Sequence, residues 1–416
     1  MAVTYNPSIS IEEELELICR GAEDVFPEGE LEKKLRKARE ERRPLRVKLG
    51  VDPTGADLHL GHVIPILKLK QFQDLGHQAI LIIGDYTATV GDPSGRNKAR
   101  PQLSHEEVLD NASRYKEQVY RILDPERTEI VYNGAWFKEM AFSDVIRLLS
   151  SMTLARMLER EDFQNRFRSQ SPISLHELVY PLMQGYDSIM VRADIELGAT
   201  DQKFNILVGR DLQRERGMEP QVGICNPVLI GLDGTEKMSK SLGNYIGLND
   251  PPEEMYGKTM SIPDDLMWMY YELITDVPIA EIQAMRDRVR EGTLHPREVK
   301  RRLARAVVGR FYAVDDVDRA EQHFDRVIGR GEAPEEMPEV VIDRGQLNNG
   351  AIWVPKLVVL AGFAASNGEA RRLIEQGGVK IDGVAVASPS EDWPARDGAV
   401  LQVGRRKFAR VRIEGA

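Results

Sequence analysis

Two short segments carry the residue types that bind phosphate. The first is His59-Leu60-Gly61-His62, which follows Asp52-Pro53-Thr54 at the end of an apolar run. The second is 234–241, where Lys237 and Lys240 stand among Ser and Gly residues. Imidazole and ammonium groups bind phosphate oxygens and stabilise the charge on a phosphate in transfer. H-x-G-H alone is a weak signal, since capping or core histidines are commoner, but K-M-S-K-S is specific. Together they predict a nucleotide site.

A third set of polar residues has the spacing of one helix face. Tyr180, Gln184 and Asp187 stand at i, i+4 and i+7, so they could line a single slot, and Pro181 predicts that the helix starts or kinks there. A buried carboxylate at Asp187 would accept a hydrogen bond from a phenol, whereas a phenylalanine ring would leave it unpaired. A charge on a helix surface is the alternative interpretation of Asp187.

Five apolar runs are expected to position these residues. They cover 46–52, 79–85, 129–133, 194–199 and 222–230. Nearly continuous Val, Ile and Leu runs, separated by helix-like segments, are typical of strands buried on both faces of a parallel sheet. The expected fold class is therefore α/β, with a doubly wound Rossmann-type parallel sheet.

The first helix after the first strand is expected to begin near Gly61 or His62, because Pro65 is tolerated only in a first turn. His59 would then lie in the preceding loop. At such a helix start the macrodipole and unpaired N–H groups favour phosphate, and Gly61 would let a nucleotide approach the backbone closely.

Length and pattern predict several domains, because 416 residues exceed what one core usually serves. We expect a helical segment at 1–45, a catalytic α/β domain at 46–248 with a helical insertion at about 105–190, and an all-α domain at 249–330. A Pro- and Gly-rich linker is expected at 331–352 and a small α+β module at 353–416. In that module Ser366 and Glu369 have capping-box spacing, and Asp382-Gly383 is a hairpin signal.

Composition excludes several classes. Apolar residues make up 42% and charged residues 29%, which is ordinary for a folded globular chain. No apolar stretch approaches a membrane span and the start lacks signal-peptide features, so we expect a cytoplasmic protein with no membrane partner. Cys19 and Cys225 stand far apart, which supports neither a disulfide framework nor a protein-bound metal.

Charge is unevenly distributed. The whole chain has a formal net charge of −10, but residues 351–416 contain ten Lys or Arg and seven Asp or Glu. Arg405, Arg406 and Lys407 lie in this basic tail, which is a candidate phosphate-backbone patch. A solvated charged face is the commoner explanation of such a cluster.

These motifs together identify a resemblance. The chain resembles the class I aminoacyl-tRNA synthetases, with HLGH as the HIGH motif and KMSKS as the second signature. Gly91-Asp92-Pro93-Ser94-Gly95, the segment 180–187 and Asp201-Gln202 are similar to the amino-acid and ATP pocket of the tyrosyl-tRNA synthetases. LAGFAASNGEARRLIEQGGVKIDG resembles the S4 RNA-binding module that these enzymes carry in bacteria. The similarity covers nearly the whole chain in the family's order.

The resemblance implies a reaction. A tyrosyl-tRNA synthetase activates L-tyrosine with ATP to tyrosyl-adenylate and pyrophosphate, and then transfers tyrosine to the 3′ end of tRNA(Tyr). Mg²⁺ would arrive with ATP. The resemblance also implies a homodimer that pairs through the insertion.

The resemblance also assigns roles to residues. Those that would act on the phosphates are Thr54, His59, His62, Arg96, Lys237 and Lys240. Those that would hold tyrosine are Lys48, Asp92, Asn133, Tyr180, Gln184, Asp187 and Gln202. Those that would bind ATP are Gly50, Asp52, Gly61, Asp201, Met238, Ser239, Lys240 and Ser241. Those that would contact tRNA are Arg371, Arg372, Arg405, Arg406 and Lys407.

Two positions depart from the family pattern. Lys48 stands where many members have a tyrosine that contacts the substrate hydroxyl; a lysine could donate to the phenol or pair with Asp187. Arg96 stands where a mobile-loop lysine is often found, and it keeps the positive charge. The alternatives to a tyrosine enzyme are another HIGH-type nucleotidyltransferase, the tryptophan enzyme, or an RNA-binding regulator with an inactive synthetase core.

Overall fold

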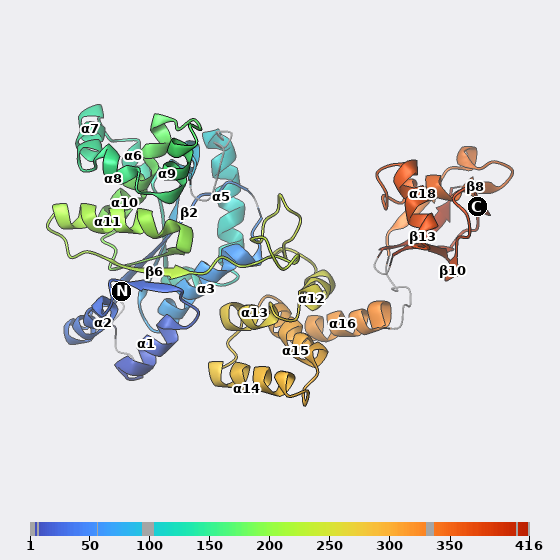
Figure 1. The fold of residues 1–416 in the computed structure, drawn as a ribbon, viewed down its shortest axis with the longest axis horizontal. Coiled ribbons are helices and arrows are strands. Elements are labelled where there is room, and N and C mark those ends of the chain that lie inside the picture. Colours follow the sequence, from blue (N-terminus) through green and yellow to red (C-terminus); the bar gives the residue numbers. More distant parts are fainter. Residues whose placement is uncertain are drawn as a thin grey trace. The chain divides into compact units, whose positions relative to one another are not determined.

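The structure is a computed structural model that describes residues 5, 8–55, 57–93, 104–329, 337–404 and 407–414. It divides into two compact units, which Figure 1 draws in sequence colours. The first comprises 1–251 with 258–311, and the second comprises 252–257 with 312–416. The division into five segments expected above stays a prediction.

A six-stranded sheet forms the centre of the first unit. Its strands are β1 (Asp24–Phe26), β2 (Arg46–Val51), β3 (Gln78–Ile83), β4 (Thr128–Tyr132), β5 (Ile195–Ala199) and β6 (Val222–Asn226), in the spatial order β1-β6-β5-β2-β3-β4. Neighbours are parallel except that β1 runs antiparallel to β6. The five predicted strands form the parallel part, so the α/β doubly wound prediction is confirmed. β1 was not predicted because three residues are too short to show a period.

Helices cover the sheet on two sides. α3 (Leu60–Asp74) follows β2 and packs on β2, β3 and β5, whereas α11 (Lys203–Glu215) joins β5 to β6 (Figure 1). Because these crossovers leave the sheet centre in opposite directions, right-handed connections put α3 and α11 on opposite faces. The reversal of strand order falls between β2 and β5, where open α/β sheets bind ligands. α3 begins at Leu60, slightly earlier than predicted, so Pro65 lies in its second turn.

The remaining helices of the chain before the second sheet are α1 (Ile11–Cys19), α2 (Glu30–Glu41), α4 (Thr87–Val90), α5 (His105–Val119), α6 (Gly134–Phe137), α7 (Phe142–Ser150), α8 (Leu154–Met157), α9 (Glu161–Arg168), α10 (Tyr180–Met190), α12 (Pro252–Ser261), α13 (Met267–Ile274), α14 (Ile279–Arg290), α15 (Pro296–Gly309) and α16 (Val314–Phe324). α5 to α10 lie in the range 105–190, for which the sequence predicts a helical insertion, and β4 of the sheet falls between α5 and α6. No helix within the described ranges is long and apolar enough to cross a membrane.

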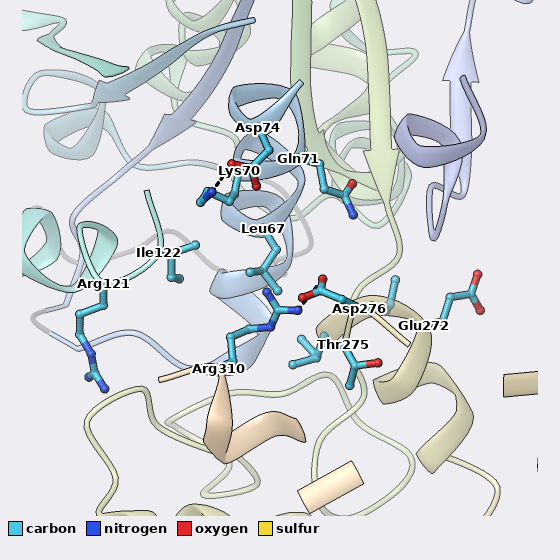
Figure 2. A pocket seen from close by; sticks show the side chains of 12 residues that line it. Leu67, Lys70, Gln71, Asp74, Arg121, Ile122, Glu272, Thr275, Asp276 and Arg310 are labelled. Carbon is cyan, nitrogen blue, oxygen red and sulfur yellow. Dashed lines mark hydrogen bonds and ion pairs between the residues drawn. The ribbon is translucent and has the colours of Figure 1, made fainter. Parts of the chain in front are cut away.

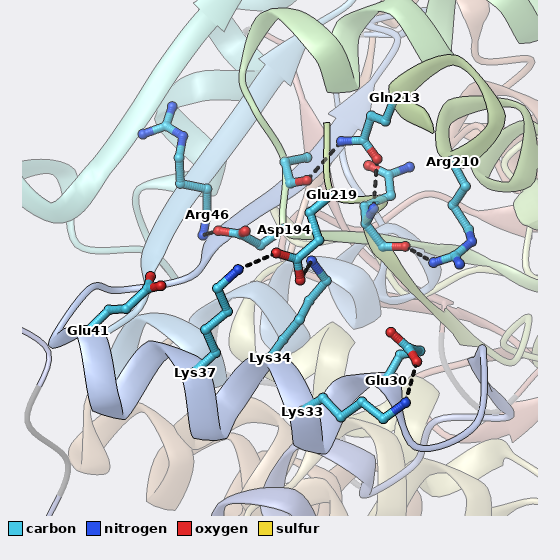
Figure 3. A network of polar contacts seen from close by, with 12 residues as sticks. Glu30, Lys33, Lys34, Lys37, Glu41, Arg46, Asp194, Arg210, Gln213 and Glu219 are labelled. Atoms are coloured by element: carbon cyan, nitrogen blue, oxygen red, sulfur yellow. Dashed lines mark hydrogen bonds and ion pairs between the residues drawn. The ribbon is translucent and has the colours of Figure 1, made fainter. Parts of the chain in front are cut away.

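A polar network fastens the N-terminal helix α2 to the sheet (Figure 3). Glu219 accepts from the ammonium groups of Lys34 at 3.1 Å and Lys37 at 2.6 Å. Asp194 accepts from the backbone N–H of Arg46 at 2.8 Å. Asp194 and Arg46 stand at the amino ends of β5 and β2, so this network lies at the end of the sheet that open α/β proteins do not use for ligands. We read it as structural.

The second unit contains a five-stranded sheet and its own apolar core. The strands are β7 (Glu339–Ile342), β9 (Val379–Ile381), β10 (Val384–Ala385), β12 (Val400–Val403) and β13 (Lys407–Ile413), in the order β10-β9-β12-β13-β7. β8 (Ala351–Trp353) pairs with β11 (Asp392–Pro394), and α17 (Val354–Leu360) and α18 (Asn367–Glu375) pack together. Asp382 and Gly383 have positive φ between β9 and β10, as the hairpin signal predicts.

Part of the expected linker belongs to this sheet. β7 lies within 331–352 and pairs in parallel with β13, from Glu339 opposite Arg410 to Ile342 opposite Ile413. A four-residue edge strand gains its stability from its partner, which local sequence does not reveal. The Ser366 hydroxyl accepts from the Glu369 N–H at 3.3 Å as expected, but the Glu369 carboxylate accepts from Ala365 N–H.

Candidate active site

The central strand of the parallel sheet is uncovered at Gly50, and we call the open surface over this residue the hollow. β2 is flanked by β3 and β5, yet Gly50 near its carboxyl end is exposed, and a Cβ built there would meet nothing within 4 Å. Central strands of such sheets are normally covered on both faces. The uncovered position lies at the strand-order reversal, where the sequence places its chemistry.

The two basic segments, far apart in sequence, meet beside this hollow. The backbone N–H of Leu60 donates to the carbonyl of Ile246 at 3.0 Å, and a Cβ on Gly61 would lie 3.7 Å from Cβ of Met238. The ammonium of Lys240 lies 3.6 Å from a carboxylate oxygen of Asp57. The HLGH helix start and the KMSKS loop thus form one basic surface.

The two histidines are held in defined tautomers. Nδ1 of His59 accepts from the N–H of Gly61 at 3.2 Å, and Nδ1 of His62 accepts from the N–H of His59 at 3.3 Å; the rings lie 3.8 Å apart. Burial, followed by the charges of His62 and Lys240, lowers the pKa of His59 to about 3. A neutral imidazole whose Nδ1 accepts carries its proton on Nε2. The neutral ring of His59 therefore carries its proton on Nε2.

The helix start itself has no spare backbone donors in its first residues. The N–H of Leu60 donates to the carbonyl of Ile246, and the N–H of Gly61 donates to Nδ1 of His59. The N–H groups of His62 and Val63 both donate to the carbonyl of His59. The expectation that unpaired N–H groups at this helix start receive phosphate is therefore wrong for these residues. Donors toward phosphate at this place must therefore come from side chains, such as the imidazole of His59 and the ammonium of Lys240.

The side chain of Asn244 fixes the backbone of the KMSKS loop through hydrogen bonds. It is buried, its Oδ1 accepts from the N–H of Ser239 at 2.8 Å, and its Nδ2 donates to the carbonyl of Lys237 at 3.1 Å and to Asp233. Met238 is buried, whereas Lys237, Lys240 and Ser241 are exposed. The loop therefore presents its cations to solvent on a fixed backbone.

A buried carboxylate forms the floor of the slot on α10. Asp187 accepts from Nε1 of Trp136 at 2.9 Å and from Nδ2 of Asn133 at 3.2 Å. Burial raises its pKa to about 7, and the charge of Lys48 and the two hydrogen bonds oppose that rise. The alternative that Asp187 is a surface charge is wrong, since the residue is almost fully buried.

Lys48 pairs with a glutamate that the sequence reasoning missed. Its ammonium lies 2.9 Å from Oε1 of Glu196 and donates to the hydroxyl of Ser188 at 2.7 Å and the carbonyl of Gln184 at 2.8 Å. Glu196 also accepts from Gln184 at 3.0 Å, from Ser188 at 3.0 Å and from Gln221. The sequence did contain a signal for this pair: Glu196 is a charged residue inside an apolar strand run, and a buried charge needs a partner.

The rim of the slot joins β2 to α10 and α4. Tyr180 donates its phenolic proton to Oδ2 of Asp52 at 2.9 Å, and Thr87 donates to Oδ1 of Asp52 at 2.7 Å. Thr54, which follows Asp52, is exposed. Asp52 is thus a fixed anchor for Tyr180 at the carboxyl end of β2.

A second acidic group lies at the carboxyl end of β5. Gln202 donates to Oδ2 of Asp92 at 2.8 Å. Desolvation raises the pKa of Asp201, the charge of Asp92 raises it further, and Lys237 lowers it. Asp201 and the KMSKS loop thus influence each other across the hollow.

Three predicted site residues, Arg96, Arg405 and Arg406, lie outside the described residues. In the second unit, Arg371 and Arg372 project from α18 and Lys407 begins β13. The guanidinium of Arg371 lies over the Trp353 ring at 5.0 Å, and Lys407 donates to the carbonyl of Phe363 at 3.2 Å. All three are exposed.

A polar cavity of about 360 Å³ lies elsewhere in the first unit (Figure 2). It is bounded by the second half of α3, by Arg121 and Ile122, and by residues 272–276 with Arg310. Two of its cations pair with acids of the same lining, Arg310 with Asp276 at 2.7 Å and Lys70 with Asp74. None of the predicted site residues lines it, so it is not the active site.

Comparison with known proteins agrees with this geometry. The family model of class I tRNA synthetases (W and Y) matches residues 40–328, and the S4 domain model matches 352–392. The tyrosine–tRNA ligases of Moorella thermoacetica and Syntrophotalea carbinolica are 52% and 51% identical, over 96% and 97% of this chain and 95% and 98% of theirs.

Solved structures of tyrosyl-tRNA synthetases also match the chain, at lower sequence identity. The Archaeoglobus fulgidus tyrosyl-tRNA synthetase complexed with L-tyrosine superposes with a TM-score of 0.60 at 26% identity, over 75% of this chain and 99% of that chain. The truncated mitochondrial tyrosyl-tRNA synthetase of Aspergillus nidulans has a TM-score of 0.61 at 24% identity, over 76% and 93%, and shares the fold.

Proposed function

The chain belongs to the class I tRNA synthetases of the tryptophan and tyrosine group, and from this premise we propose that it activates L-tyrosine with ATP and transfers it to the 3′ end of tRNA(Tyr). The observation that carries the choice of tyrosine is the buried carboxylate of Asp187 beneath the hollow, held by Trp136 and Asn133. Its acceptor oxygens suit a phenolic O–H, and a phenylalanine ring would leave them unsatisfied. The named relatives support the same substrate.

In the first step the tyrosine carboxylate attacks the α-phosphorus of ATP. A bond forms between that oxygen and phosphorus, the bond to the bridging oxygen breaks, and pyrophosphate leaves. The nucleophile is already ionised, so catalysis rests on alignment and charge stabilisation. Thr54 and the Nε2–H donors of His59 and His62 contact the phosphates, while Lys237, Lys240 and Arg96 neutralise pyrophosphate. Mg²⁺ arrives with ATP as part of the substrate.

The nucleotide occupies the hollow between β2 and the KMSKS loop. Gly50 leaves room for it, whereas the His59 ring and Met238 fill the space beside Gly61. Asp201 accepts from a ribose hydroxyl. The ATP-binding residues are Gly50, Asp52, Gly61, Asp201, Met238, Ser239, Lys240 and Ser241. The fixed backbone around Asn244 supports this assignment, because a positioned cationic loop needs no reorganisation during reaction.

Tyrosine lies along α10. Tyr180, Gln184, Asp92 and Gln202 hold its ammonium end, and Asp187 with Asn133 holds its hydroxyl. Lys48 acts indirectly, because its ammonium already pairs with Glu196, while its positive charge lowers the pKa of Asp187. This assigns Lys48 to the support of the pocket.

In the second step a ribose hydroxyl at the tRNA 3′ end attacks the adenylate, and AMP leaves. The S4 module holds the tRNA through Arg371, Arg372, Arg405, Arg406 and Lys407, whose charges contact phosphates. We keep the domain boundaries 46–248, 249–330 and 353–416 as the working division, and we place the reaction in the cytoplasm.

The partner in assembly is a second copy of the chain. Phe142, Ile146 and Leu149 stand at i, i+4 and i+7 on α7 and are all exposed, and Leu154 and Phe167 on α8 and α9 are exposed as well. An apolar stripe of this kind on an amphipathic helix is typical of an interface. The insertion that carries it is the one that the family resemblance assigns to dimerisation.

The deciding experiment is ATP–pyrophosphate exchange scanned across all twenty amino acids. We expect exchange with tyrosine alone. Exchange with tryptophan would favour the tryptophan enzyme, and absence of exchange with every amino acid would favour an RNA-binding protein with an inactive core.

A further inference from the structure

A buried arginine from the insertion reaches the amino-acid end of the slot. Arg160 lies at the N-cap of α9 and is almost fully buried. Its guanidinium donates to Oδ1 of Asn205 at 3.1 Å and lies 3.5 Å from Oδ1 of Asp92, and its Nε lies 2.9 Å from Asp162. Arg160 therefore touches the carboxylate that is assigned to the tyrosine ammonium, without itself facing the hydroxyl end.

These contacts close a ring. Arg160 donates to Asn205, the Nδ2 of Asn205 donates to Oε1 of Gln202 at 3.1 Å, and Nε2 of Gln202 donates to Asp92 at 2.8 Å. Asp92 returns to Arg160 through their ion pair. The same Nδ2 donates to Oε1 of Gln184 at 2.8 Å, and Nε2 of Gln184 donates to Glu196 at 3.0 Å.

The arginine and the two carboxylates require the same direction for each amide in this ring. A guanidinium has only donors, so the oxygen of Asn205 must face it and the nitrogen must face Gln184 and Gln202. Each glutamine then presents its oxygen to Asn205 and its NH₂ group to a carboxylate. The carboxylates of Asp92 and Glu196 favour the same arrangement because they only accept, and Arg160 adds the donor that holds Oδ1 of Asn205.

We propose that Arg160 is a positioning residue for tyrosine binding, which orients Asp92 directly and Gln184 and Gln202 through Asn205. The inference rests on the proposed function, because it assigns those three residues to the ammonium of tyrosine. The ring does not include Asp187 at the hydroxyl end of the slot. Gln202 also hydrogen-bonds to Asp201, which is assigned to the ATP ribose, so the ring borders the ATP subsite as well.

Two variants separate this role from a general loss of folding. Arg160→Met removes the donor, and Asn205→Asp keeps the shape and the partner of Arg160 but removes the donating NH₂ group. Arg166→Met is the matched control, because Arg166 is a buried arginine of the same helix that pairs with Glu177 at 2.5 Å and reaches no pocket residue in the described contacts.

The measurements are ATP–pyrophosphate exchange and inhibition by two analogues. Tyramine carries the phenol and the ammonium, whereas 3-(4-hydroxyphenyl)propionate carries the phenol without an ammonium. We expect Arg160→Met and Asn205→Asp each to raise the KM for tyrosine and the inhibition constant of tyramine by about tenfold, as for one lost hydrogen bond to a charged group. The inhibition constant for the propionate should stay within about twofold, and Arg160→Lys should recover part of the loss.

Equal weakening of both analogues, or an equal rise in the KM for tyrosine in Arg166→Met, would show that Arg160 only supports the fold and would overturn the inference. Unchanged tyramine inhibition in Asn205→Asp would do the same. Lack of tyrosine exchange in the unmodified enzyme would overturn the proposed function and this inference together, so the two failures are distinguishable.

Discussion

The ammonium of Lys48 lies 2.9 Å from Oε1 of Glu196, and both side chains are buried beneath the slot that carries Asp187. This pair joins β2 to β5 at the strand-order reversal and also holds α10 through Ser188 and Gln184. Each charge is surrounded by hydrogen-bond partners, which is the condition under which a buried pair is tolerated.

Breaking that pair should destabilise the enzyme. Lys48→Met or Glu196→Gln alone should lower the free energy of unfolding by ~3–5 kcal/mol, because a single variant leaves an unpaired buried charge or its unfilled donors. The double variant should lose less than the sum of the two single losses. Urea unfolding of the three variants provides the measurement. Additive losses would mean that the two charges do not interact.

The carboxyl of Asp187 should make stability depend on pH. Its pKa is raised to about 7 in the folded enzyme, against about 4 for an unfolded aspartate, so the folded state binds the proton more tightly. Stability from this group therefore falls as pH rises from about 4 to 7 and is level above. Asp187→Asn should gain stability relative to the unmodified enzyme between pH 5 and 8 in urea unfolding. Asp110→Asn, at an exposed position on α5, is the control. An equal gain in stability with rising pH in this control variant would contradict the prediction.

The same carboxyl should govern tyrosine use. An ionised Asp187 accepts a hydrogen bond from the phenolic O–H of tyrosine. The kcat/KM for tyrosine in exchange should therefore rise with pH and become constant above about 7. Asp187→Asn should lose that rise and lower kcat/KM for tyrosine by at least about a hundredfold, while phenylalanine changes little. A pH profile that persists in the variant would assign the titration to another group.

Lys240 should act on the phosphates and not on tyrosine. Lys240→Ala should slow pyrophosphate formation in a single turnover by about a hundredfold, which is typical for loss of one group that stabilises transition-state charge. The dissociation constant of tyrosine, measured by equilibrium dialysis, should stay unchanged. Lys203→Ala, an exposed lysine on α11 that pairs with Asp24, should leave both values unaltered. Unchanged pyrophosphate release in Lys240→Ala would refute the role.

The basic residues of α18 should serve tRNA alone. The double variant Arg371→Ala, Arg372→Ala should raise the KM for tRNA in the charging reaction. The slope of log affinity for tRNA against log salt concentration should become shallower by about 0.7–0.9 for each phosphate contact that is lost. Tyrosine-dependent exchange should be normal. Arg396→Ala, an exposed arginine that pairs with Asp382, is the control within the same module. An equal effect of both changes would indicate only a general charge effect.

The exposed stripe on α7 should hold two copies together. Ile146→Glu should shift the enzyme from dimer to monomer in sedimentation experiments, because a carboxylate would be buried without a partner. Ile279→Glu, at an exposed apolar position on α14, should not. A monomeric unmodified enzyme would contradict the assignment of this surface.

Local patterns were enough to predict the parallel sheet and to locate the two signatures. Continuous apolar runs predicted the five parallel strands, and KMSKS with HLGH predicted a phosphate site. Which side chains meet became visible in the folded chain alone. Lys48 could have paired with Asp187, and the fold gave it Glu196, since β2 and β5 are neighbours although about 150 residues separate them. Likewise β7 and the ring around Arg160 depend on partners distant in sequence, and no local period or cap records such partners.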